Sequence, residues 1–261
     1  MSKKKIPGLI TPAFSNIKDS TFTVLEKGLA DIFSNSGKKI SFEELYRSCY
    51  LLVLNKQGSF LYSQIENIFT LELSRKNISI ISDFLFLHDE FSLKLSLIRD
   101  VLMYLDKSFI PLHSLKSINE LGMGKFKEII LLENIGKIIK YFLEKVDSDR
   151  SDYLQDFDDL KKITEIFHAF NVYTVLEEEF LENSRDFYSR QVDTLKESGV
   201  AGYVIGVKKR IQEEDERMDK YMRGETRKKI LELILMILVK NQRDWIINVC
   251  HGSSEARPVI T

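Results

Sequence analysis

Apolar residues recur at helical spacing along almost the whole chain, from Phe22 to Val249. Four prolines and twelve glycines interrupt the 261 residues, and this sparse punctuation predicts long helices. Residues 78–87 (ISIISDFLFL) have strand propensity, but no second strand with a matching turn lies nearby, so a helix is our interpretation. The pattern predicts an all-α fold, an elongated α-solenoid of multi-helix units with no sheet.

One helix has both ends marked by local signals. Ser41 and Glu44 form an S-x-x-E capping box, and Ile40 can pack on Leu45 as a hydrophobic staple, which predicts a helix start at Ser41. Gly58 is the predicted stop.

This helix has more apolar surface than one buried stripe requires. The arc predicted to face the core contains Leu45, Cys49, Leu52, Phe42 and Val53. The shoulder of that arc contains Tyr46, Tyr50, Glu43 and Leu54. Because one stripe is enough to hold a helix, the shoulder contacts either a neighbouring element of this chain or a partner protein.

Residues 90–107 carry two apolar stripes. The first contains Phe91, Leu95, Ile98, Leu102 and Leu105. The second, roughly opposite, contains Leu93, Leu97, Val101 and Tyr104. We expect this helix to be sandwiched between neighbours.

The acidic segment 146–159 predicts a boundary near Ser151. Residues 1–18 are expected to form a flexible extension, 19–150 a first unit and 151–261 a second, incomplete one. Helices are predicted over 154–169, 176–195, 203–223 and 226–249, the third ending at a C-cap, Gly224. Gly202 and Gly206 indicate close approach by a neighbour; alternatively, the helix begins after Gly206.

Composition excludes several classes of protein. Lysine plus arginine (38) nearly cancels aspartate plus glutamate (39), so we expect no nucleic-acid or membrane partner. Cys49 and Cys250 lie far apart, which predicts no disulfide and a reducing compartment, the cytoplasm or the nucleus or both. The N-terminus has no signal-peptide pattern, and the apolar run 231–239, predicted to be a buried helix, is about half a membrane span.

No residues suggest an enzyme, a metal site or a cofactor. The four histidines are scattered without metal-ligand spacing, and no nucleophile elbow, Walker loop or dinucleotide turn is present. Gly122 and Gly124 are interpreted as a turn between helices. The carboxylate runs 177–179 and 213–216 are interpreted as solvated helix faces.

Three segments resemble the cullin family, in cullin order. ISFEELYRSCYLLVLNKQGSFLY (40–62) is similar to the second helix of the first cullin repeat, and LIRDVLMYLDKSFI (97–110) to the fifth-helix signature. EEEFLENSRDFYSRQVDTL (177–195) with RIQEEDERMDKYM (210–222) resembles the second repeat. SFEELYR and NKQG look closest to the cullin-three-like subfamily, which binds BTB-domain adaptors.

The resemblance implies a non-catalytic scaffold of a ubiquitin ligase that binds a substrate adaptor through its first repeat. The implied adaptor-binding residues are Ile40, Phe42, Glu43, Tyr46, Tyr50, Leu54, Tyr104 and Lys107. By position alone, the tail adds Ile6, Leu9 and Ile10. A RING subunit would bind only through a C-terminal half that is absent here.

The sequence departs from the family pattern in places. Lys107 stands where arginine is frequent, which removes a planar fork of donors, and His88 stands where tryptophan is common. The resemblance fades after about Val249, so we expect a fragment that ends inside the second repeat. The alternatives are a cullin that binds a Skp-type adaptor, or an unrelated helical tethering or nucleic-acid-binding solenoid.

Overall fold

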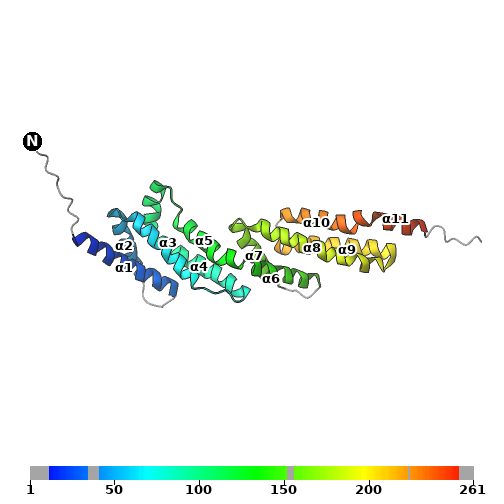
Figure 1. Ribbon diagram of the computed structural model, residues 1–261, viewed down its shortest axis with the longest axis horizontal. Coiled ribbons are helices and arrows are strands. Elements are labelled where there is room, and N and C mark those ends of the chain that lie inside the picture. Colours follow the sequence, from blue (N-terminus) through cyan, green and yellow to red (C-terminus); the bar gives the residue numbers. More distant parts are fainter. Residues whose placement is uncertain (1–11, 35–40, 152–155, 223, 253–261) are drawn as a thin grey trace, which may run out of the picture. The chain divides into compact units, whose positions relative to one another are not determined.

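A computed structural model of the chain describes residues 12–34, 41–151, 156–222 and 224–252. Within these ranges the regular structure is helical and no strand occurs (Figure 1), which confirms the predicted all-α class. The helices form two compact units, residues 1–135 and 136–261.

The first unit is built from α-helices with short π and 3₁₀ helices between them. Both kinds of short helix are labelled η. They are α1 (Pro12–Ser34), α2 (Phe42–Leu54), α3 (Gly58–Ser74), α4 (Ile81–Val101), η1 (Leu105–Phe109), η2 (Pro111–His113), α5 (Ile118–Phe126) and η3 (Lys127–Leu131). Helix α6 (Leu132–Arg150) begins in this unit and continues into the second. Helix α4 confirms the helical interpretation of residues 78–87 from Ile81 onward.

Helix α2 begins where the sequence predicts and ends earlier. The Ser41 hydroxyl accepts a hydrogen bond from the Glu44 backbone N–H at 3.3 Å, as an N-cap does. The last residue is Leu54, and Lys56 turns the chain with a φ of 59°. Gly58 is therefore not the stop; it opens α3, where a Cβ would lie 2.4 Å from the Phe109 ring.

An aromatic cluster forms the core of the first unit. The rings of Phe33, Phe69, Phe91 and Phe126 lie with neighbouring centroids 5.5–6.3 Å apart. His88, at the position where a tryptophan is common, adds its ring edge-on to Phe126 at 5.7 Å. An aromatic contact is thus kept despite the substitution.

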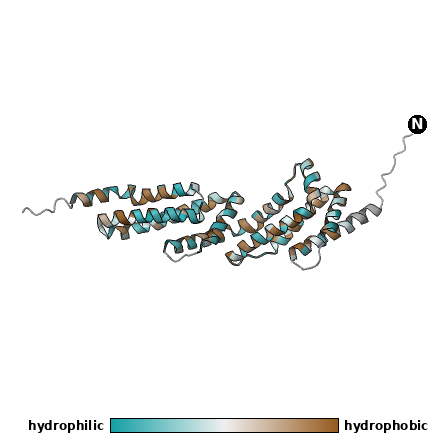
Figure 2. Ribbon diagram, turned by 180° about the vertical axis from the view of Figure 1, so that it is seen from behind, coloured by the Kyte–Doolittle hydropathy of each residue, from teal (hydrophilic) through white to brown (hydrophobic). Residues whose placement is uncertain are grey.

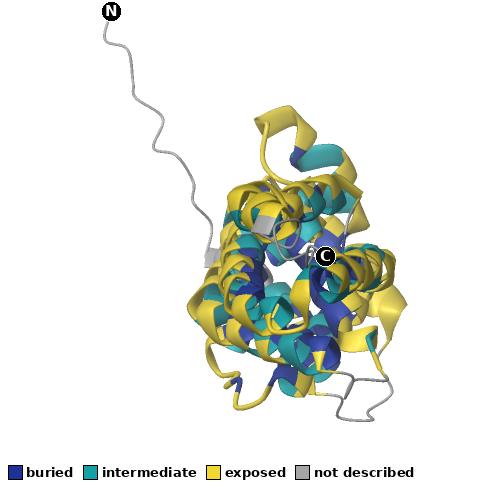
Figure 3. Ribbon diagram, turned by 90° about the vertical axis from the view of Figure 1, so that its right-hand side faces the viewer, coloured by how far each residue is buried: buried dark blue, intermediate teal, exposed yellow. Residues whose placement is uncertain are grey.

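Helix α4 buries one of its two predicted stripes. Phe91, Leu95, Ile98, Leu102 and Leu105 are all buried, as predicted. In the second stripe Val101 is buried and Tyr104 is half-buried, but Leu93 is 67% exposed and Leu97 is 37% exposed. The sandwich prediction is therefore wrong for the first half of that stripe. Figure 3 shows buried and exposed residues alternating along the helices.

Gly122 and Gly124 lie inside helix α5 rather than in a turn between helices. A Cβ on Gly122 would lie 2.6 Å from the Leu95 side chain, so this glycine permits close packing of α5 on α4. The contact comes from a residue distant in sequence, and no local pattern signals it.

The second unit contains the end of α6 and further helices. They are α7 (Asp158–Ala169), α8 (Tyr173–Lys196), α9 (Gly199–Tyr221), α10 (Gly224–Leu238), η4 (Lys240–Gln242) and α11 (Arg243–Gly252). Helix α9 includes Gly202 and Gly206, so the alternative start after Gly206 is wrong. A Cβ on Gly206 would lie 2.6 Å from Leu195, which confirms the predicted close approach there.

Two predicted helix ends in this unit are wrong. Helix α9 ends at Tyr221, because Met222 is extended, and Gly224 opens α10 instead of capping α9. The predicted helix 226–249 is broken after Leu238 by η4.

The apolar run 231–239 is buried on one side only. Ile234 and Leu238 have no exposed surface, whereas Leu235, Met236 and Val239 are 40–49% exposed. Figure 2 shows hydrophilic and hydrophobic residues following one another along the helices, as amphipathic helices require. Among the described residues, no helix has both the length and the apolar character to cross a membrane.

The compact units do not coincide with the predicted domains. The first unit ends inside α6, and the predicted boundary near Ser151 follows that helix. Helix α1 begins at Pro12, within the stretch predicted as an extension. The division into an extension (1–18) and two repeats (19–150 and 151–261) stays a prediction, since packing units and sequence repeats need not share boundaries.

Candidate protein-binding surface

Helix α2 separates a complete core face from an exposed apolar one. Its buried residues are Leu45, Ser48, Cys49 and Leu52. Ser48 can be buried on this face because its hydroxyl donates to the Glu44 carbonyl oxygen at 2.9 Å, which satisfies the buried polar group. Two residues of the predicted core arc lie elsewhere: Phe42 is 44% exposed and Val53 is half-buried.

Cys49 behaves as an apolar core side chain. Burial raises the pKa of its thiol to about 11, and a hydrogen bond with the Leu105 backbone opposes this shift only in part. The thiol therefore stays protonated and joins the inner side of α2 to η1.

The outer side of α2 carries the residues of the predicted shoulder. Tyr50 and Leu54 are exposed, Leu54 at 57%, and Tyr46 is half-buried. Glu43 is exposed and forms an ion pair with Arg47 at 3.0 Å. An exposed pair of this kind contributes little to stability, so the Glu43 carboxylate can exchange its partner at small cost.

The structure brings the shoulder together with the segment that directly follows α4. The rings of Tyr50 and Tyr104 lie 4.6 Å apart between centroids, tilted by 56°. Lys107 follows in η1 and is exposed. The α2–α4 surface is defined here as Phe42, Glu43, Tyr46, Tyr50, Leu54, Tyr104 and Lys107. Ile40 and the tail residues Ile6, Leu9 and Ile10 lie outside the described residues.

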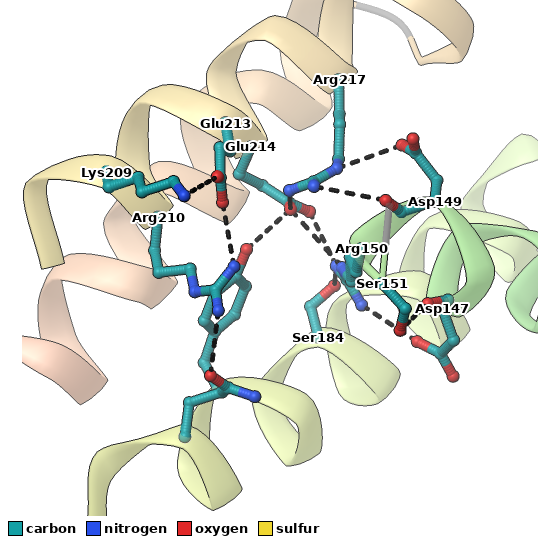
Figure 4. Close-up of polar contacts among 12 residues, drawn as sticks. Asp147, Asp149, Arg150, Ser151, Ser184, Lys209, Arg210, Glu213, Glu214 and Arg217 are labelled. Atoms are coloured by element: carbon teal, nitrogen blue, oxygen red, sulfur yellow. Dashed lines mark hydrogen bonds and ion pairs between the residues drawn. The ribbon is translucent and has the colours of Figure 1, made fainter. Parts of the chain in front are cut away.

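A buried polar network in the second unit is absent from the sequence interpretation (Figure 4). Glu214 has no exposed surface, although the run 213–216 was expected on a solvated face. Its carboxylate accepts from Arg150 at 2.7 Å, from the Tyr188 hydroxyl at 2.6 Å and from Arg217 at 3.3 Å. The prediction is wrong for Glu214 because side chains on α6 and α8 donate the hydrogen bonds that water would donate to an exposed carboxylate.

Other groups complete this network. Arg150 also donates to the Ser184 hydroxyl at 2.5 Å, and Arg217 donates to Asp149 at 3.1 Å. Burial alone would raise the pKa of the Glu214 carboxyl, but the two arginines and the tyrosine outweigh that effect and hold the pKa below its usual range. Glu214 is therefore ionised and fully paired, which is the arrangement of a structural group.

Glu177 in the other carboxylate run is also buried. It accepts from the Thr226 hydroxyl at 2.9 Å and from Lys229 at 2.6 Å, which joins α8 to α10. One sequence signal could have identified Glu214: it lies at helical spacing from the apolar Met218 and Tyr221, on the stripe that α9 buries.

Comparisons with known proteins agree with this architecture. The model of the cullin alpha solenoid domain matches residues 22–255. Cullin-3B of Arabidopsis thaliana is 26% identical over 245 residues, which cover 88% of this chain and 34% of that protein. Cullin-3 of Schizosaccharomyces pombe is 26% identical over 279 residues, with 88% and 36% covered. Cullin-4 of Dictyostelium discoideum is 26% identical over 261 residues, with 94% and 32% covered.

These matches confirm the resemblance and, with the helices described above, the solenoid fold class. The chain spans about a third of the length of the curated relatives it matches. The adaptor-binding residues stay predictions.

Proposed function

Because the chain belongs to the cullin family, we propose that it is the N-terminal part of a ubiquitin-ligase scaffold that binds a BTB-domain substrate adaptor through the α2–α4 surface. The observation that carries the proposal is the contact of Tyr50 with Tyr104 on the outer side of a helix whose core face is already complete. The surface holds the protein partner, and this part of the chain has no catalytic role in the proposal.

The composition of the surface supports a protein partner. Tyrosines near the centre of an interface often supply most of its binding energy, and here two of them support each other. Phe42 and Leu54 add apolar area at either end of α2, while Glu43 and Lys107 provide opposite charges. Aromatic and apolar side chains combined with charged ones are typical of protein interfaces.

The adaptor class rests on the sequence. SFEELYR and NKQG resemble the BTB-binding subfamily, and the relatives include proteins named Cullin-3. In the proposed complex a RING subunit would bind elsewhere in a full-length scaffold, and the complex would act in the cytoplasm, the nucleus or both.

Calorimetric titration with purified BTB-domain proteins and a Skp-type protein tests this proposal. We expect at least one BTB protein to bind one-to-one with a Kd of about 1 μM or tighter, which is about −8 kcal/mol. Binding to the Skp-type protein alone would show that the adaptor class is wrong. Binding to neither would contradict the proposed role of the surface.

A second prediction concerns the N-terminal tail, of which residues 1–11 lie outside the described part of the chain. Residues 3–14 combine lysines with Ile6, Leu9, Ile10 and Phe14, and the subfamily resemblance implies that such a tail docks on the adaptor. Ordering the tail costs chain entropy, so its net contribution should be modest. Deleting residues 1–11, which leaves the start of α1 intact, should weaken binding by about 1–2 kcal/mol, mainly through faster dissociation measured by surface plasmon resonance. Equal dissociation rates for the two chains would reject the idea.

A further inference from the structure

The α2–α4 surface ends in an irregular helical turn. Regular α-helix stops at Val101, and residues Leu105–Phe109 form a π-helix in which the Ile110 N–H donates to the Leu105 carbonyl oxygen at 3.1 Å. Single π turns cost stability relative to an α-helix and are frequent at functional sites. Here the π turn contains Lys107 and directly follows Tyr104, so it sets the direction of the Lys107 side chain relative to Tyr104.

The Asp106 carboxylate connects this π turn to the next helix. One of its oxygens, Oδ1, accepts a hydrogen bond from the backbone N–H of Ile118 at 2.9 Å. Ile118 is the first residue of α5, where unpaired N–H groups and the helix dipole favour a negative charge. The bond closes the loop 107–117 between its two ends.

The surrounding contacts hold the same corner against the rest of the unit. The Tyr62 hydroxyl donates to the Lys116 carbonyl oxygen at 3.0 Å, and the Phe109 ring packs on the backbone of Gly58. The Ser108 hydroxyl donates to the Tyr104 carbonyl oxygen at 2.5 Å. Among these contacts, the Asp106 bond is the one that joins the π turn to α5.

We propose that Asp106 is a positioning residue for adaptor binding: by tying the π turn to the start of α5, it keeps Tyr104 against Tyr50 and Lys107 exposed on the α2–α4 surface. The inference rests on the proposed function. An α-helical continuation would remove the extra residue of the π turn, so the side chain of Lys107 would point in another direction relative to Tyr104, the residue just before the turn. Releasing the carboxylate therefore disorganises one end of the surface while the buried face of α4 stays packed.

Three variants separate positioning from simple helix capping. Asp106→Ala removes the acceptor, and Asp106→Asn keeps an oxygen acceptor without the charge. Glu120→Ala is the matched control, because the Glu120 carboxylate caps the same end of α5 through Ser117 without touching the π turn. Against a BTB adaptor we expect affinity losses of about 10-fold for Asp106→Ala, about 3-fold for Asp106→Asn and under about 2-fold for Glu120→Ala.

Hydrogen exchange provides a readout that needs no adaptor. The amide of Ile110 should exchange about 10-fold faster in Asp106→Ala than in the parent chain, and unchanged in Glu120→Ala. If the parent chain binds no adaptor, the proposed function fails, and the exchange rates still decide whether Asp106 holds the π turn. Unchanged exchange in Asp106→Ala, or equal affinity losses in Asp106→Ala and Glu120→Ala, would overturn the inference.

Discussion

Replacing Glu214 with alanine should lower the free energy of unfolding of the second unit by about 3–5 kcal/mol, because it removes the buried carboxylate that both Arg150 and Arg217 contact. The side chain of Arg150 has no exposed surface, and the 2.7 Å contact of its guanidinium with Glu214 would be lost. The Tyr188 hydroxyl would lose its acceptor as well. Urea unfolding followed by circular dichroism measures the loss.

An exposed carboxylate of the same helix is the control. Glu216→Ala removes a solvated glutamate two residues away and should change stability by no more than about 0.5 kcal/mol. The double variant Arg150→Met/Glu214→Leu should be less destabilised than Glu214→Ala, because apolar groups of similar size leave no unpaired charge. Equal effects of Glu214→Ala and Glu216→Ala would mean that water solvates the network.

Lowering the pH should reduce the stability that the same network contributes. The pKa of Glu214 is lowered on folding, so its ionised form contributes stability that is fully present above the pKa of the unfolded chain. That contribution is lost as the pH falls through the lower folded value. The parent chain should therefore lose more stability on acidification than Glu214→Ala does, and equal losses would contradict the shift.

Features that depend on neighbours in sequence could be predicted. The start of α2 follows from Ser41 and Glu44, which are three residues apart and need nothing else to cap a helix. The buried stripe from Phe91 to Leu105 follows from helical spacing in the same way. The shoulder of α2 could be placed on its outer side because the core face was complete without it.

Features that depend on residues distant in the sequence could not be predicted. Gly58 and Gly122 look like helix breaks, yet each is required by a side chain from elsewhere in the chain, Phe109 and Leu95 respectively. Glu214 looks solvated because its neighbours are charged, but Arg150 lies 64 positions away. The π turn at Leu105–Phe109 has no signal in helical spacing, because it changes that spacing by one residue.

Two neighbouring positions on α2 offer a direct separation of binding from stability. Tyr50 is 36% exposed and Leu52 is 3% exposed, so two residues along the same helix face opposite environments. Tyr50 contacts Tyr104 on the outer surface, whereas Leu52 belongs to the buried side with Leu45 and Cys49. Replacing either residue with alanine should keep the helix intact, since alanine is the best helix former.

Tyr50→Ala should therefore weaken adaptor binding by about 2 kcal/mol, roughly 30-fold, while lowering the free energy of unfolding by no more than about 1 kcal/mol. Leu52→Ala should do the opposite, costing about 2–5 kcal/mol of stability through the cavity it leaves, with little change in affinity while the chain stays folded. Calorimetric titration and urea unfolding of both variants test the pair. A large loss of stability in Tyr50→Ala with unchanged affinity would assign Tyr50 to the core and remove the centre of the α2–α4 surface.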